Sequence, residues 1–158
     1  MELADSTLKY TPFPTAFKQV KGSVGNIETE ATSTYFADQI LITISQHGCL
    51  SQWIEVPISS SVAASFTKLG AQYTQFPSGN GDDEMELPES HLTPKTLLGS
   101  GGEQRENIAH LFAMNIASSI VKKNPEECRT ILVGLGLEKV VLQREDFFDM
   151  MELLHVII

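Results

Sequence analysis

The histidines and acidic residues of this chain are its first candidates for metal chemistry, but their spacing does not favour a metal site. The four histidines show no His-x-His or His-x-x-x-His spacing, and Glu152 and His155 form a single Glu-x-x-His pair. A di-iron bundle needs two such pairs and two further carboxylates on four helices. His155 is better explained as a cation near the C-terminus of a helix. The sequence therefore predicts no metal ion and no other cofactor.

The cysteines and serines are the candidates for a nucleophile. His47, Gly48 and Cys49 place an imidazole and a thiol close together in the sequence, but a cysteine nucleophile needs a base within reach and a third group that orients the base. Neighbouring turn residues rarely point toward each other, and no serine lies in a Gly-x-Ser-x-Gly elbow. We predict a protein that is not an enzyme, with a thiol enzyme using Cys49 as an alternative. Cys49 and Cys128 belong to no Cys-x-x-Cys pair, which is typical of reduced thiols in an intracellular protein.

A glycine-rich segment, Gly99-Ser100-Gly101-Gly102, precedes a predicted helix and is a candidate anion site. It lacks the Lys-Ser/Thr pair of a P-loop, and Glu103 and Glu106 in the first helical turn would repel a phosphate. Ser100 and Glu103 match a Ser-x-x-Glu capping box. We therefore interpret the segment as the start of a helix.

Composition excludes several classes of protein. The chain has 158 residues, 42% of them apolar and 20% charged, and one domain is expected at this length. The formal net charge of −9 has the wrong sign for non-specific binding to nucleic acid. The apolar run Ile131–Leu137 is far shorter than the ~20 residues that span a bilayer, and Glu2 and Asp5 do not fit a signal peptide. We expect a cytoplasmic protein that binds neither nucleic acid nor a membrane, with the nucleus as a second compartment.

The negative charge is concentrated in one segment. Between Lys68 and Lys95 there is no basic residue, and five acidic residues occur there: Asp82, Asp83, Glu84, Glu86 and Glu89. The segment is also rich in glycine and proline and has too little apolar surface to offset the entropy of ordering it. We predict a flexible acidic loop at about residues 70–92 and a flexible N-terminal arm at residues 1–15. Residues 16–158 are predicted to form a single domain.

Residue periodicity predicts strands in the first half of the chain and two helices in the second. His47-Gly48 is a turn signal, from which we expect a hairpin between the flanking strands. The predicted strands are 17–22, 26–36, 39–45, 50–58, 95–98 and 130–137, and the predicted helices are 103 to about 122 and 143–158. The apolar stripe of the first helix is Ile108, Leu111, Phe112, Ile116 and Ile120. The fold class is α+β: a single antiparallel sheet of five to six strands with two helices on one face, in the order β-β-β-β-β-α-β-α.

Two predicted strands are apolar on both faces, which indicates that both faces of the sheet are covered. Two helices suffice for only one face, so we predict that a second subunit covers the other; the alternative cover is the N-terminal arm. Gly134 and Gly136 are expected to make that second face shallow, so that another layer can approach closely. The residues predicted to form the dimer interface are Thr43, Trp53, Leu132, Gly134 and Gly136.

Several segments, in the same order along the chain, resemble the proteasome assembly chaperone 3 family. The resemblance covers most of residues 25–158, apart from the acidic loop. Its most specific piece is Lys95-Thr96-Leu97-Leu98-Gly99, followed by a helix that contains Phe112-Ala113-Met114-Asn115. The other pieces are the segment Asp38–Gly48, the strand Thr130–Leu137 and the C-terminal helix. The acidic loop and the long N-terminal arm depart from the shorter members of the family.

The resemblance implies a non-catalytic chaperone of 20S proteasome assembly. The expected partners are an assembly chaperone 4-like subunit, in a heterodimer or, in isolation, a homodimer, and a 20S proteasome α-type subunit. The pair would bind the α-type subunit while the α-ring forms and leave as β-subunits join. The family fold is an antiparallel sheet with helices on one face, and its dimers stack sheet against sheet. The rival hypothesis is a dimeric scaffold subunit of another intracellular complex, with a roadblock- or longin-like fold.

Overall fold

The computed structural model describes residues 15–58, 92–99, 101–139 and 142–158. These residues form strands and helices in the order β-β-β-β-β-α-β-α, so the predicted α+β class is confirmed. The predicted arm and acidic loop lie outside the described residues, except for Thr15 and Leu92 at their ends. The elements are β1 (Ala16–Val24), β2 (Ile27–Tyr35), β3 (Gln39–Gln46), β4 (Gln52–Val56), β5 (Lys95–Leu98), α2 (Glu103–Lys123), β6 (Thr130–Gly136) and α3 (Arg144–His155).

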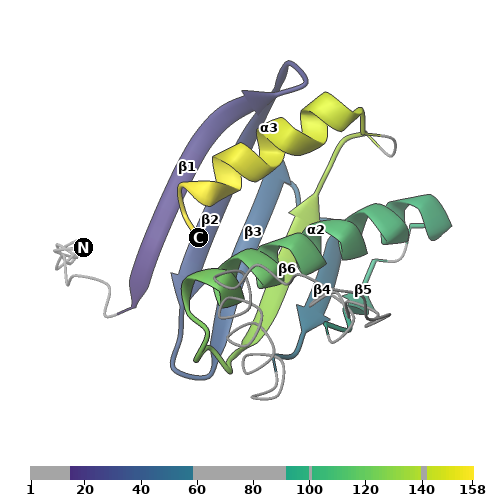
Figure 1. The fold of residues 1–158 in the computed structure, drawn as a ribbon. Coiled ribbons are helices and arrows are strands. Elements are labelled where there is room, and N and C mark those ends of the chain that lie inside the picture. Colours follow the sequence, from purple (N-terminus) through teal and green to yellow (C-terminus); the bar gives the residue numbers. More distant parts are fainter. Residues whose placement is uncertain (1–14, 59–91, 100, 140–141) are drawn as a thin grey trace, which may run out of the picture.

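The strands form one six-stranded sheet in the order β1-β2-β3-β6-β4-β5 (Figure 1). Neighbouring strands are antiparallel except β3 and β6, which are parallel, so the sheet is mixed and not wholly antiparallel as expected. The predicted hairpin between β3 and β4 is wrong, because β6 lies between them. β6 is apolar along almost its whole length. Such a sequence is typical of a strand in the interior of a sheet, where both faces are covered.

Two tight turns contain residues with positive φ, as hairpin turns require. Gly25-Asn26 has φ angles of 57° and 64° and joins β1 to β2. His47-Gly48 has φ angles of 55° and 69° and closes a single bridge between Gln46 and Cys49. The turn predicted at His47-Gly48 is confirmed, but the chain leaves β3 after that one bridge.

Both helices lie side by side over the same face of the sheet (Figure 1), and the core lies between them and the sheet. Phe112 and Ile116 of α2 and Met150 and Leu154 of α3 are 0% exposed. Burial of one such side chain contributes about 1.5–3 kcal/mol. The sheet residues of the same cluster, all fully buried, are Ile40, Ile42, Ile44, Ile54, Val56, Ile131, Val133 and Leu135.

The buried stripe of α2 differs from the prediction at one position. Leu111 was expected in the stripe but is 48% exposed. The buried positions include Ala109, Ala113 and Ala117, each at most 1% exposed. Alanine side chains are short, so the helix backbone can approach the sheet while the larger residues fill the remaining space.

The capping box predicted at the start of α2 is wrong. The N-cap of the helix is Gly102, and no side chain there makes a capping hydrogen bond. Glu103 is the first helical residue, whereas a capping box needs its glutamate at the third. Ser100 lies outside the described residues. Glu103 and Glu106 do lie in the first turn, where carboxylates interact favourably with the helix dipole.

A partly buried ion pair fastens the start of β6 to the connection between β2 and β3. Glu127 is 4% exposed and accepts hydrogen bonds from Nε and Nη2 of Arg129, each at 2.7 Å. Arg129 Nη1 donates to the carbonyl of Phe36 at 2.8 Å, and the guanidinium lies 5.5 Å from the centroid of the Tyr35 ring. The hydrogen bonds from Arg129 hold the pKa of the Glu127 carboxyl below its ordinary value of 4.5.

We expect Glu127→Gln to lower the free energy of unfolding by roughly 2 kcal/mol at pH 7, because the charge-assisted hydrogen bonds to Arg129 are lost. The pKa of Glu127 is lower in the folded protein than in the unfolded chain, so this stabilisation is complete above about pH 4.5 and declines as the pH falls below that value. Urea denaturation of both proteins at pH 7 and pH 3 measures the difference. A difference that stays the same at pH 3 would contradict this account.

Candidate functional site

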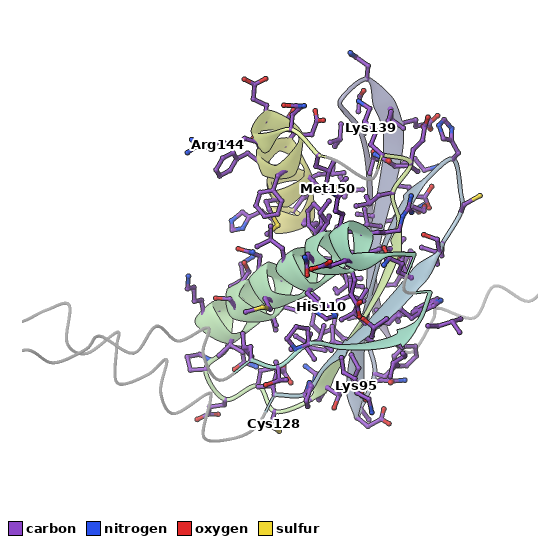
Figure 2. The ribbon with its side chains drawn as sticks, turned by 90° about the vertical axis from the view of Figure 1, so that its right-hand side faces the viewer. Lys95, His110, Cys128, Lys139, Arg144 and Met150 are labelled. Atoms are coloured by element: carbon purple, nitrogen blue, oxygen red, sulfur yellow. The ribbon has the colours of Figure 1, made fainter. Side chains whose placement is uncertain are left out.

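One face of the sheet carries α2 and α3, and the opposite face, named the open face here, carries neither helix; Figure 2 shows both helices on one side of the sheet. Register identifies the residues of the open face, because residues paired across neighbouring strands point to the same side. Thr43 of β3 is paired with Gly134 of β6, which is paired with Trp53 of β4. Two residues before Thr43 in β3, Leu41 is paired with Leu132 of β6. These residues alternate with the buried residues that face the helices.

The residues predicted for the dimer interface all lie on the open face. β6 contributes three of them, and positions two apart in a strand point the same way. The alternation seen in the sequence therefore assigned the correct face to Thr43, Trp53, Leu132, Gly134 and Gly136. Their use as an interface stays a prediction.

The two glycines have a different role from the one expected. A Cβ atom added to Gly134 would lie 2.9 Å from Cζ3 and 3.0 Å from Cη2 of Trp53, so the indole ring lies over Gly134. A Cβ atom added to Gly136 would overlap the backbone carbonyl of Cys49, because the connection between β3 and β4 passes over β6 there. The expectation of a shallow face left for another layer is wrong at these positions, since this chain fills the space itself. An aromatic ring packed on a cross-strand glycine replaces the missing side chain of the glycine.

The β1–β2 half of the open face is mostly polar, although Phe17, which register places on this face through Thr34 and Leu41, is 52% exposed. The hydroxyl oxygens of Thr32 and Thr43 lie 2.6 Å apart across β2 and β3. The Glu30 carboxylate lies 2.9 Å from Lys21 Nζ and accepts a hydrogen bond from Gln19 Nε2 at 2.6 Å. The hydrogen bond with Lys21 lowers the pKa of Glu30 and raises the pKa of Lys21. Because these groups face water, the pair contributes little to stability, and its charges disfavour the addition of another strand at β1.

The β4–β5 half of the open face is apolar at one end, whereas Glu55 and Lys95, paired across β4 and β5 next to Leu132, make its other end charged. Leu98 of β5 is 66% exposed and is paired with Trp53. A register shift beside Trp53 leaves Leu97 as an extra residue, 48% exposed. Leu50 is 40% exposed and belongs to the connection that passes over β6. Leu50, Trp53 and Leu98 are named the apolar corner below.

Sequence reasoning missed Leu50, Leu97 and Leu98 as surface residues. The available signal was a pair of adjacent leucines in a four-residue strand, because at least one of them must face away from the core. Leu50 gave no such signal, since the β3–β4 connection was assigned to a hairpin strand.

The other candidates from the sequence do not form a catalytic arrangement. Nε2 of His47 lies 2.8 Å from Oε2 of Glu138, and the thiol of Cys49 donates to the backbone carbonyl of His47 at 3.7 Å. The imidazole is thus paired with Glu138 and not with the thiol. Within the described ranges, no three His, Cys, Asp or Glu side chains are placed to hold a metal ion. No helix in this part of the chain is long and apolar enough to cross a membrane.

A groove of about 430 Å³ lies on the outer side of the helix layer, between α2 and α3. Its lining residues are Ser119, Phe148, Met151, Glu152, His155 and Ile158. Serine, histidine and glutamate are the side chains of many hydrolases, but the Ser119 hydroxyl donates its hydrogen to the carbonyl of Asn115 at 2.8 Å. The proton that a catalytic base would remove is therefore bonded to the helix backbone.

These features define a class of protein: one mixed sheet with both helices on one face and an exposed opposite face. No protein-family model and no curated protein matches the sequence. Among solved structures, the chain is similar to a chain in the crystal structure of a novel chaperone complex for yeast 20S proteasome assembly, with a TM-score of 0.59 and 15% sequence identity. The match covers 89% of this chain and 97% of that chain. At this identity the similarity establishes a shared fold.

We expect Gly136→Ala to destabilise the fold by about 3 kcal/mol or more, because the added methyl group overlaps backbone atoms of Cys49. Gly134→Ala should cost only about 1 kcal/mol, because the far edge of the Trp53 ring can shift outward. Urea denaturation measures both values, and the fluorescence of Trp53, the single tryptophan, reports the shift of its ring. Equal costs for the two variants would contradict the crossing of the connection over Gly136.

Proposed function

We propose that this protein is a non-catalytic chaperone of 20S proteasome assembly. It pairs through the open face with a related small chaperone, binds an α-type subunit while the α-ring forms, and is released as β-subunits join. The fold that it shares with a chain of the yeast chaperone complex supports this proposal, as does the family resemblance of its sequence. The observation that carries the proposal is the open face, because neither described helix covers its apolar corner.

The apolar corner supplies the driving force for pairing. Transfer of apolar surface from water contributes about 25 cal/mol per Å², and Leu98 and Leu50 are 66% and 40% exposed. The ring of Trp53 covers Gly134 from the outside, so an aromatic surface lies next to these leucines. Aromatic side chains dominate the energetics of many interfaces. A second sheet packed at about 10 Å would bury all of this surface.

A partner of the same fold suits the rest of the open face. Its middle carries Thr43, Leu41 and Leu132, which are neutral. The Glu55 carboxylate lies beside Leu132 and has Lys95 as its other cross-strand neighbour, so a basic side chain is close to the one charge that borders this middle. The charged residues Lys21 and Glu30 lie toward the β1–β2 side and already pair with each other. A homodimer of the isolated chain and a heterodimer with a related chaperone both satisfy these conditions.

The interaction with the α-type subunit is proposed to be reversible, because the chaperone must leave when β-subunits join. Reversible complexes have smaller and more polar interfaces than obligate dimers. We therefore assign the apolar corner to the dimer and not to the α-type subunit. This work would take place in the cytoplasm and the nucleus.

A dimeric scaffold subunit with a roadblock- or longin-like fold is the alternative function. Two helices near the start of the chain would favour it. Residues 15–58 instead form four strands, and the described helices begin at Glu103 and Arg144. Nothing in the described part of the chain favours this alternative.

Leu132→Asp should weaken pairing at least tenfold, because it places a second carboxylate beside Glu55 in the middle of the proposed interface. Leu111→Asp is the matched control, since Leu111 is exposed on α2 and faces away from the sheet. Sedimentation at micromolar concentration, with and without a related chaperone, measures the association. A wild-type protein that stays strictly monomeric under both conditions would remove the dimer from the proposal.

The wild-type protein, tagged and recovered from cell extract, should bring with it free 20S α-type subunits and a related small chaperone. Leu132→Asp should lose the related chaperone, whereas Leu111→Asp should keep it. Mass spectrometry and immunoblotting identify the recovered subunits. If neither class of protein is recovered with the wild type, the assembly function is wrong, whatever the oligomeric state of the isolated chain.

A further inference from the structure

Three phenylalanine rings lead from the core to the outer surface of the helix layer. Phe112 of α2 is 0% exposed, and its ring centroid lies 4.9 Å from that of Phe147 of α3. The ring of Phe147 meets that of Phe148 edge-on at 6.0 Å, and Phe148 is 55% exposed. The guanidinium of Arg144 lies 5.5 Å from the centroid of the Phe148 ring. Phe148 is therefore held in place by contacts on two sides while more than half of it faces water.

The groove described above begins at this fixed ring. Met151 and Ile158 supply the rest of its apolar lining, and Ser119 supplies the wall on α2. Its volume of about 430 Å³ is typical of binding sites, but it is open to solvent on its outer side. A small ligand would keep much of its surface in water here. The shape is better suited to a few side chains of a protein segment.

The two rims of the groove differ in charge. On α3, Glu152 lines the groove together with His155, and Glu145 and Asp149 are exposed seven and three residues before Glu152. No ion pair within the described residues joins their carboxylates to a basic side chain. On the α2 side the lining residue is the neutral Ser119, and Lys123, at the end of α2, donates to the main-chain oxygen of the lining residue Ile158 at 2.6 Å.

We propose that this groove is a docking site for an amphipathic helix of a partner protein, with aliphatic residues on one face and Lys or Arg on the flank that meets α3. The aliphatic residues would contact Phe148 and Met151, and the basic flank would pair with Asp149 and Glu152. A helix is the fitting element because a groove between two neighbouring helices accepts the side-chain ridge of a third. Because Phe148 is already held in position, little side-chain entropy is lost on binding.

This site lies on the helix side of the sheet, opposite to the open face, and it stands whether or not the open face forms a dimer. The two surfaces share no described residue. Variants of one surface therefore serve as controls for the other, and failure of one proposal leaves the other testable.

The test uses two synthetic helical peptides of about 18 residues, long enough to form a helix in water. Both carry leucine at positions i, i+3, i+4 and i+7 on an alanine background; one carries lysine along a flank, and the other carries glutamate at the same positions. Fluorescence anisotropy with the full-length protein measures the affinities. The lysine peptide should bind about tenfold more tightly than the glutamate peptide, and less so at high salt.

Phe148→Ala should weaken binding of the lysine peptide about tenfold, whereas Leu111→Ala, at a similarly exposed position outside the groove, should not change it. The double variant Asp149→Lys with Glu152→Lys should reverse the preference between the two peptides. Equal affinity for the two peptides, or full binding by Phe148→Ala, overturns the proposal. A lower sedimentation mass for Phe148→Ala would mean that a second copy of this chain occupies the groove, which also overturns it.

Discussion

The position of β6 inside the sheet is the constraint on which the rest of the structure depends. β6 is parallel to β3 at one edge and antiparallel to β4 at the other, although it follows both of them in the chain. Ile40 of β3 is paired with Ile131 of β6, a pairing between residues far apart in sequence. The sheet is therefore complete only after α2 has crossed from the β5 edge to the centre. Such non-local pairing costs loop-closure entropy, and the apolar residues that β6 buries offset this cost.

The position of β6 also determines which residues lie next to each other on the open face. If β3 and β4 formed a hairpin, Trp53 would have a β3 residue as its cross-strand neighbour. The inserted β6 instead places Gly134 beside Trp53, and the indole ring packs over the glycine. Gly136 in turn leaves room for the backbone at Cys49 to cross the sheet toward β4. The apolar corner is thus a product of strand order and of two missing side chains together.

Local patterns in the sequence predict most elements of this fold, because alternation and helical spacing are properties of neighbouring residues. The strand Lys95–Leu98 has its predicted bounds, and Gln39–Gln46 is within one residue of them. Strand order could not be predicted, since alternation states which face a residue takes but not which strand lies beside it. The glycines of β6 show the same limit. A missing side chain signals a close approach, but the sequence does not state that Trp53 and Cys49 of the same chain make it.

The two exposed apolar surfaces lie on opposite sides of one core, and this arrangement bears on how an assembly factor can work. A factor that holds a partner and later releases another needs sites that can be occupied independently. The side chains between the surfaces, such as Ile42 and Phe112, are 0% exposed, and a packed core of this kind resists continuous deformation. Occupants of the open face and of the groove are therefore separated by the core and do not touch each other. Energetic coupling between the sites would need two discrete arrangements of this core.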